Sequence, residues 1–87
     1  MIPEYGDLSQ LAGKKTVVGA KQLRKALQRG TARKVLLAIN ADPAITEPIE
    51  QMCRELHIQI TWVRSMADLG RTCGIEVGAA AAAVIRP

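Results

Sequence analysis

One stretch of the chain, Gly19-Ala20-Lys21-Gln22-Leu23-Arg24-Lys25, combines a glycine with cations at helical spacing. Lys21 and Lys25 would share one face of a helix that starts after Gly19, where like charges four residues apart repel one another. Lys21 would also lie at the positive end of the helix dipole. An anion would reverse both effects, because backbone N–H groups at a helix start bind phosphate. The stretch therefore indicates either a phosphate site or a basic face that is simply solvated.

A second stretch, Ile75-Glu76-Val77-Gly78, lies between Gly74 and a run of alanines. Gly74 follows a periodic apolar segment and is expected to end a helix, because glycine takes the left-handed closing conformation at little cost. In the expected loop, two branched apolar side chains flank a carboxylate. Such a loop either buries Ile75 and Val77 or holds them out for a partner. The pattern alone leaves both interpretations open.

Catalytic and metal-binding motifs are missing from the sequence. It contains no P-loop, dinucleotide-binding glycine motif, nucleophile elbow or zinc-protease motif. Cys53 and Cys73 are far apart, with only His57 as another soft ligand, so neither a zinc site nor a disulfide is expected. Cys73 falls on an apolar helical face, as a small core residue does. We therefore expect that the protein is not an enzyme, has no catalytic residue and binds no metal or cofactor.

The composition bounds the class of protein. The chain has 87 residues, of which 48% are hydrophobic, and this predicts a single globular domain over residues 1–87 with a thin aliphatic core. Tyr5 and Trp62 are the only aromatic residues, so an aromatic platform for single-stranded nucleic acid is not expected. A net charge of +4 favours polyanionic partners. No signal peptide or membrane span is recognisable, so we expect a cytoplasmic protein.

Hydrophobic periodicity and turn residues predict alternating helices and strands. Asp7 should cap a short helix that ends at Gly13. The later helices are expected over 20–29, from about 45 to 57 with Thr46 and Pro48 in the first turn, and from the Ser65/Asp68 capping pair to Gly74. Strands are expected over 16–18, 34–40 and 58–63. The alanine-rich segment 79–85 fits a helix, because alanine is the best helix former, or a strand, which Gly78 and Val84-Ile85 favour, and we expect the strand. The apolar face of the middle helix should carry Ile49, Met52, Cys53 and Leu56.

The alternation implies crossover connections and a sheet covered by helices on both faces. Exposed side chains are expected for Lys21, Lys25 and Arg71. The side chains expected to be mostly buried are Leu23, Leu27, Val35, Leu37, Ile39, Ile49, Met52, Ile60 and Leu69.

The signature Leu-Gly-x-x-x-Gly-Ile-Glu-Val-x-Ala-Ala, from Leu69 to Ala80, resembles that of the L7Ae/L30e superfamily of large-subunit ribosomal proteins. The resemblance covers about residues 15 to 85 and includes the stretch from Gly19 to Lys25 and Asp42-Pro43. It implies an α/β fold, a three-layer α/β/α sandwich around a four-stranded mixed sheet. It also implies binding of kink-turn RNA, a bent motif with tandem sheared G·A pairs.

The resemblance carries roles to particular positions. In the family, the turn after the first strand and the start of the next helix enter the groove at the G·A pairs. That element is matched here by Gly19, Lys21, Gln22 and Lys25. Arg71 matches a basic position of the family pattern, and Asp42 matches an acidic one. The family's second element, whose apolar residues meet an extruded nucleotide, is matched by Ile75, Glu76, Val77 and Gly78.

This chain has Lys21-Gln22 where the archaeal and eukaryotic branch has Asn-Glu, and it resembles the bacterial branch instead. Glutamine keeps a carbonyl acceptor for guanine but loses the charge. The expected function is stabilisation of a bent RNA by a monomeric, ribosomal or ribosome-associated protein. A protein-interaction adaptor that uses Ile75 and Val77 is the alternative. The RNA hypothesis requires the start of the helix at 20 to lie close to the loop at 75–78.

Overall fold

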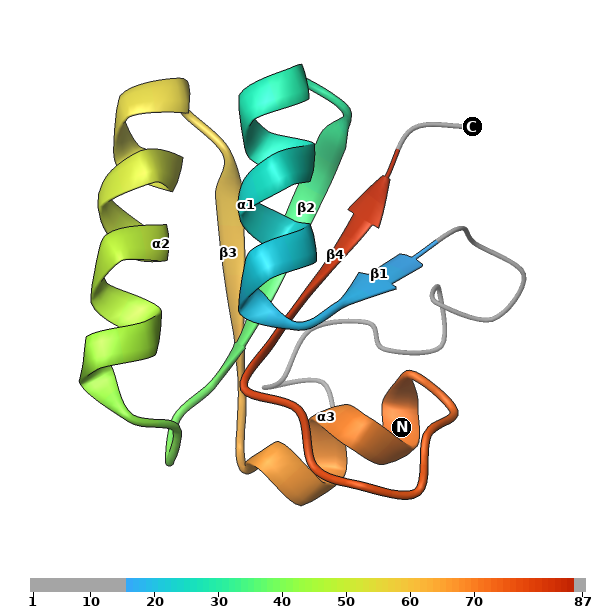
Figure 1. The fold of residues 1–87 in the computed structure, drawn as a ribbon. Coiled ribbons are helices and arrows are strands. Elements are labelled where there is room, and N and C mark those ends of the chain that lie inside the picture. Colours follow the sequence, from blue (N-terminus) through green and yellow to red (C-terminus); the bar gives the residue numbers. More distant parts are fainter. Residues whose placement is uncertain (1–15, 86–87) are drawn as a thin grey trace.

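Strands and helices alternate along the chain in the computed structural model, which describes residues 16–85 (Figure 1). The expected helix capped by Asp7 lies outside these residues. The elements are β1 (Thr16–Val18), α1 (Ala20–Arg29), β2 (Ala32–Ala38), α2 (Pro43–Leu56), β3 (Gln59–Val63), α3 (Met66–Thr72) and β4 (Ala81–Ile85). Every helix and strand expected within the described residues is therefore present.

The four strands form one mixed sheet in the order β1-β4-β2-β3. β2 and β3 run parallel and are joined by α2, because parallel neighbours need a crossover connection. β4 runs antiparallel to both of its neighbours, β1 and β2. The carboxyl ends of β1, β2 and β3 therefore lie together at the end of the sheet where β4 begins.

Helices cover both faces of this sheet, as expected (Figure 1). α1 and α2 pack on one face, over a core that includes Val35, Leu37 and Ile49. α3 packs on the other face, where Leu69 meets Leu36 and Val63. The alanine run is a strand and not a helix, and its residues alternate between the two cores. Its small side chains let α1 approach β4 closely.

Most of the expected core is confirmed, and the exceptions are spread over α2, β3 and the end of β2. Met52 and Ile60 are only partly buried. Ile39 is 61% exposed, so the expectation that it is buried was wrong. It lies one residue beyond β2, at the end of the sheet where α1 and α2 begin, so neither helix covers it. Leu56 is 48% exposed because it is the last residue of α2. The confirmed buried residues are Leu23, Leu27, Val35, Leu37, Ile49 and Leu69.

Caps set the helix boundaries. α2 starts earlier than expected, because the Asp42 carboxylate accepts a hydrogen bond from the Ala44 N–H (2.9 Å) and Pro43 occupies the first turn. Pro48 consequently lies inside the helix. α3 starts as expected, since the Ser65 hydroxyl accepts a hydrogen bond from the Asp68 N–H (3.1 Å). None of the helices within residues 16–85 is both long and apolar enough to cross a membrane.

Candidate nucleic-acid interface

The start of α1 leaves backbone donors free of side-chain caps. Gly19 precedes the helix with a φ of 102°, a conformation that side-chain-bearing residues rarely adopt, and it makes no side-chain cap. The first turn of α1 contains no acidic residue. The N–H groups of this turn, at the positive end of the helix dipole, are therefore not occupied by a carboxylate of the helix itself.

The outer face of α1 is cationic. Leu23, Ala26 and Leu27 face the sheet and are buried, and the polar residues point outward. Lys21, Gln22 and Lys25 are all exposed, as expected for the two lysines. α1 carries four cations and no carboxylate, so its field along the exposed face has a single sign. This face offers charge for phosphates and an amide for hydrogen bonding.

The loop of residues 75–78 is held at both ends by α3. The Ile75 N–H donates to the Gly70 carbonyl (3.0 Å), and the Ala79 N–H donates to the Met66 carbonyl (2.9 Å). Ile75 is partly buried against the core beneath α3, whereas Val77 is 70% exposed. Of the two apolar residues, Ile75 is thus the one that packs inward and Val77 is the one that is exposed. Ile75 anchors the loop, and Val77 is held out in solvent.

Two glycines let the loop backbone lie directly on α3. A Cβ at Gly70 would come within 2.1 Å of the Val77 carbonyl oxygen, closer than any side chain permits. A Cβ at Gly78 would lie 3.2 Å from the Met66 Cβ. Because the backbone of one element fills the space of the missing Cβ of the other, the position of Val77 is fixed by contact with the helix.

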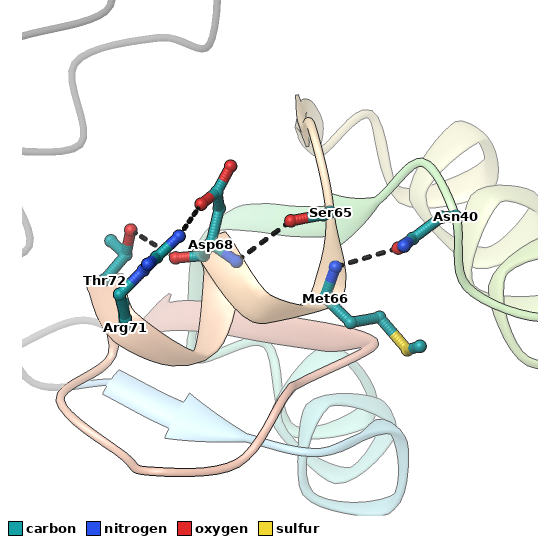
Figure 2. Close-up of polar contacts among 6 residues, drawn as sticks. All are labelled: Asn40, Ser65, Met66, Asp68, Arg71 and Thr72. Carbon is teal, nitrogen blue, oxygen red and sulfur yellow. Dashed lines mark hydrogen bonds and ion pairs between the residues drawn. The ribbon is translucent and has the colours of Figure 1, made fainter.

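Polar contacts fix α3 beneath the loop (Figure 2). The Asn40 side-chain oxygen accepts a hydrogen bond from the Met66 N–H (2.8 Å), so the turn after β2 holds the start of the helix. The Thr72 hydroxyl donates to the Asp68 carbonyl (2.8 Å). The Arg71 guanidinium forms an ion pair with the Asp68 carboxylate, and its side chain remains 75% exposed. Arg71 therefore presents a partly neutralised cation beside the loop.

One backbone contact links the start of α1 to the strand that follows the loop. The Gly19 N–H donates to the Ala81 carbonyl (2.9 Å), and Ala81 follows Gly78 by three residues. The start of α1 thus lies next to the first residue of β4, the strand into which the loop leads (Figure 1). Gly19 is partly buried, while Glu76 and Gly78 are exposed with Val77.

The sequence did not identify Asn40 and Met66 as parts of this region, and it identified Gly70 only as a member of the family signature. Asn40 and Met66 are 26 residues apart, and no local pattern joins them. Gly70 is unfavourable inside a helix by about 1 kcal/mol relative to alanine, but this signal does not say what the glycine contacts. Its contact with Val77 explains why a residue that weakens a helix occupies this position.

Neither described cysteine is prepared for nucleophilic chemistry. Burial raises the pKa of the Cys73 thiol above its ordinary value. The pKa of Cys53 is raised by burial and, to a lesser extent, by the nearby Glu50 carboxylate. Both thiols therefore stay protonated at neutral pH, and the thiolate is the reactive form.

The fold and the helix–loop arrangement define a class of protein. The sequence model of the ribosomal protein L7Ae/L30e/S12e/Gadd45 family matches residues 6–87, and the chain belongs to this family. An RNA-binding protein of Geobacillus sp. strain WCH70 is 47% identical over 72 residues, 83% of this chain and 88% of that protein. An RNA-binding protein of Bacillus pumilus is 41% identical over 81 residues, 93% of this chain and 96% of that one.

Further likeness comes from a bacterial relative and from solved structures. The RNA-binding protein YbxF of Geobacillus stearothermophilus is 43% identical over 83% of this chain and 88% of its own length. The 15.5 kD RNA-binding protein of Giardia lamblia superposes with a TM-score of 0.79, covering 100% of this chain and 85% of that one at 22% identity. A protein from Bacillus halodurans, also 22% identical, superposes with a TM-score of 0.77 and covers 95% of this chain and 81% of its own. These structures share the fold with this chain, and the three bacterial sequence relatives are described as RNA-binding proteins.

Proposed function

We propose that this protein binds structured RNA, specifically kink-turns with tandem sheared G·A pairs, and stabilises their bent form. Membership of the L7Ae/L30e/S12e/Gadd45 family and the RNA-binding relatives support RNA as the ligand. The observation that carries the proposal is the hydrogen bond between Gly19 and Ala81, which joins the cationic helix start to the strand after the loop. One RNA motif can then contact both elements at once.

In the proposed complex, the start of α1 meets the groove at the G·A pairs. Lys21 and Lys25 contact phosphates, where charge holds the RNA without reading its sequence. Gln22, exposed in the first turn, offers an amide oxygen and an amide nitrogen to base edges. Because Gln22 carries no charge, each of its hydrogen bonds is weaker than a carboxylate's would be. The chain compensates with the extra cation, Lys21.

The loop supplies an apolar contact. Val77 is exposed and its backbone is fixed on α3, so an extruded base can cover the side chain without ordering the loop first. Glu76 and Gly78 flank Val77 in this contact, Ile75 anchors it from below, and Arg71 borders it with a cation. Binding that needs both elements favours the bent RNA over the extended form, because only the bent form presents both surfaces together.

The biological setting follows the same proposal. We infer a single domain over residues 1–87 that binds RNA as a monomer in the cytoplasm, as a ribosomal or ribosome-associated protein. The family's ribosomal members support this setting. The net charge of +4 suits a polyanionic assembly.

Calorimetric titration against two RNAs tests the proposal. One RNA is a kink-turn, and the other is the same duplex with its G·A pairs replaced by Watson–Crick pairs. We expect much tighter binding to the kink-turn and a clear decrease of both affinities with salt. Equal affinity for the two RNAs would contradict kink-turn recognition, although a steep salt dependence would still support general RNA binding.

A second candidate function is a protein-interaction adaptor, favoured by the exposure of Val77. In that case the charges serve solubility alone. The adaptor hypothesis predicts little salt dependence of binding and no nucleic acid carried through purification. An elevated ratio of absorbance at 260 and 280 nm before a high-salt wash would count against it.

A further inference from the structure

Ile39 is a large apolar side chain at the same end of the sheet as the proposed interface, and it takes no part in the contacts described above. Single exposed apolar residues are common, so exposure alone does not indicate a role for Ile39. Its position relative to the proposed interface is the relevant observation. Its N–H donates to the Val63 carbonyl (2.8 Å), which continues the pairing of β2 with β3 by one residue. The backbone of Ile39 is therefore fixed, although its side chain is in solvent.

Backbone pairing places Ile39 near the start of α1. The Ala38 N–H donates to the Ala80 carbonyl (3.0 Å), and the Gly19 N–H donates to the next carbonyl, that of Ala81. The first residues leading into β4 thus lie between the end of β2 and the glycine that opens α1. Ile39 follows Ala38 directly, so only one strand separates it from the cationic helix start.

A second set of contacts joins the turn that follows Ile39 to the loop. Asn40, the next residue, holds the Met66 N–H through its side chain (Figure 2). The Met66 carbonyl in turn accepts a hydrogen bond from the Ala79 N–H, and Gly78 lies against the Met66 Cβ. The turn after β2, the start of α3 and the loop that carries Val77 are therefore one connected structure.

We propose that Ile39 is a further RNA contact, a dry surface for an unstacked nucleobase or its ribose beyond the α1 start. This inference rests on the proposed function. Continuity with the helix start and with the loop supports RNA as the occupant. A polyanion held by Lys21 and Lys25 brings its bases to this end of the sheet, where an aliphatic side chain can cover a base face.

The test compares two serine variants, Ile39→Ser and Leu56→Ser. Leu56 is the matched control, because it is also an exposed aliphatic residue but lies at the far end of α2. Affinity for the kink-turn is measured by titration at several salt concentrations. We expect Ile39→Ser to bind about three- to tenfold more weakly with an unchanged salt slope, whereas Leu56→Ser should bind like the wild type. Ile39→Leu should retain the affinity.

The outcomes separate this inference from the proposed function. Wild-type affinity in Ile39→Ser would overturn the inference and leave Ile39 for a protein partner, even if the wild type still discriminates between the two RNAs. Equal wild-type affinity for both RNAs would overturn kink-turn recognition. In that case, a loss of affinity for either RNA in Ile39→Ser but not in Leu56→Ser would still support Ile39 as an RNA contact. Equal losses in both serine variants would overturn the inference, because the effect would then be independent of position.

Discussion

Replacing Gly70 with alanine tests whether the loop is positioned by backbone contact with α3. The new Cβ would lie 2.1 Å from the Val77 carbonyl oxygen, 3.1 Å from the carbonyl carbon and 3.2 Å from the Gly78 Cα. The position of a Cβ is fixed by its own backbone, and the three neighbouring atoms are all backbone, so no side-chain rotation can relieve the contact. The loop has to move away from the helix by about 1 Å or more, as in other overpacked sites.

The net effect on stability is the difference between two terms. Alanine in place of glycine stabilises a helix by about 1 kcal/mol, whereas overpacking costs about 1–3 kcal/mol. We therefore expect Gly70→Ala to lower the free energy of unfolding by up to about 2 kcal/mol. The displaced Val77 should also weaken kink-turn binding by about tenfold, equivalent to about 1.4 kcal/mol.

Urea unfolding and RNA titration measure the two effects of Gly70→Ala separately. Ala67→Gly is the control, since Ala67 is exposed on the same helix and the change should lower stability by up to about 1 kcal/mol without touching the loop. Its kink-turn affinity should remain that of the wild type. A Gly70→Ala protein that is more stable than the wild type and binds equally well would refute the backbone-contact argument.

Three further variants separate the roles within the interface. Lys25→Ala should weaken binding to every RNA alike and lower the salt slope by about one unit, and an unchanged slope in a salt series would exclude a phosphate contact. Gln22→Ala should cost about 1–3 kcal/mol in titrations against the kink-turn and much less against a plain duplex, so equal losses would make Gln22 a generic contact. Val77→Ser should reduce kink-turn affinity while leaving the salt slope unchanged, and its unfolding free energy should change by no more than about 0.5 kcal/mol because the side chain is exposed. A lowered slope for Val77→Ser would show that its effect is not that of an apolar contact.

Features set by local chemistry were predictable from the sequence. The αL conformation of Gly30 ends α1, and the Ser65 hydroxyl caps α3, because both depend only on neighbouring residues. The periodicity of Leu23 and Leu27 likewise identified the buried face of α1.

Features set by tertiary contacts were not predictable in this way. The exposure of Ile39 depends on where two helices begin, and the role of Asn40 depends on a helix 26 residues away. For the candidate site, the sequence indicated a helix start and a loop but not the glycine contact that joins the loop to α3. That contact is a packing relation between backbones, which no residue pattern specifies by itself.

Fluorescence energy transfer measures directly whether binding of this protein stabilises the bent form of the RNA. A kink-turn duplex with a donor on one helical end and an acceptor on the other reports the distance between its ends. We expect the wild-type protein to raise transfer efficiency at concentrations that match its affinity, and the duplex with replaced G·A pairs to show no rise. Binding without a rise in efficiency for the kink-turn would contradict the account.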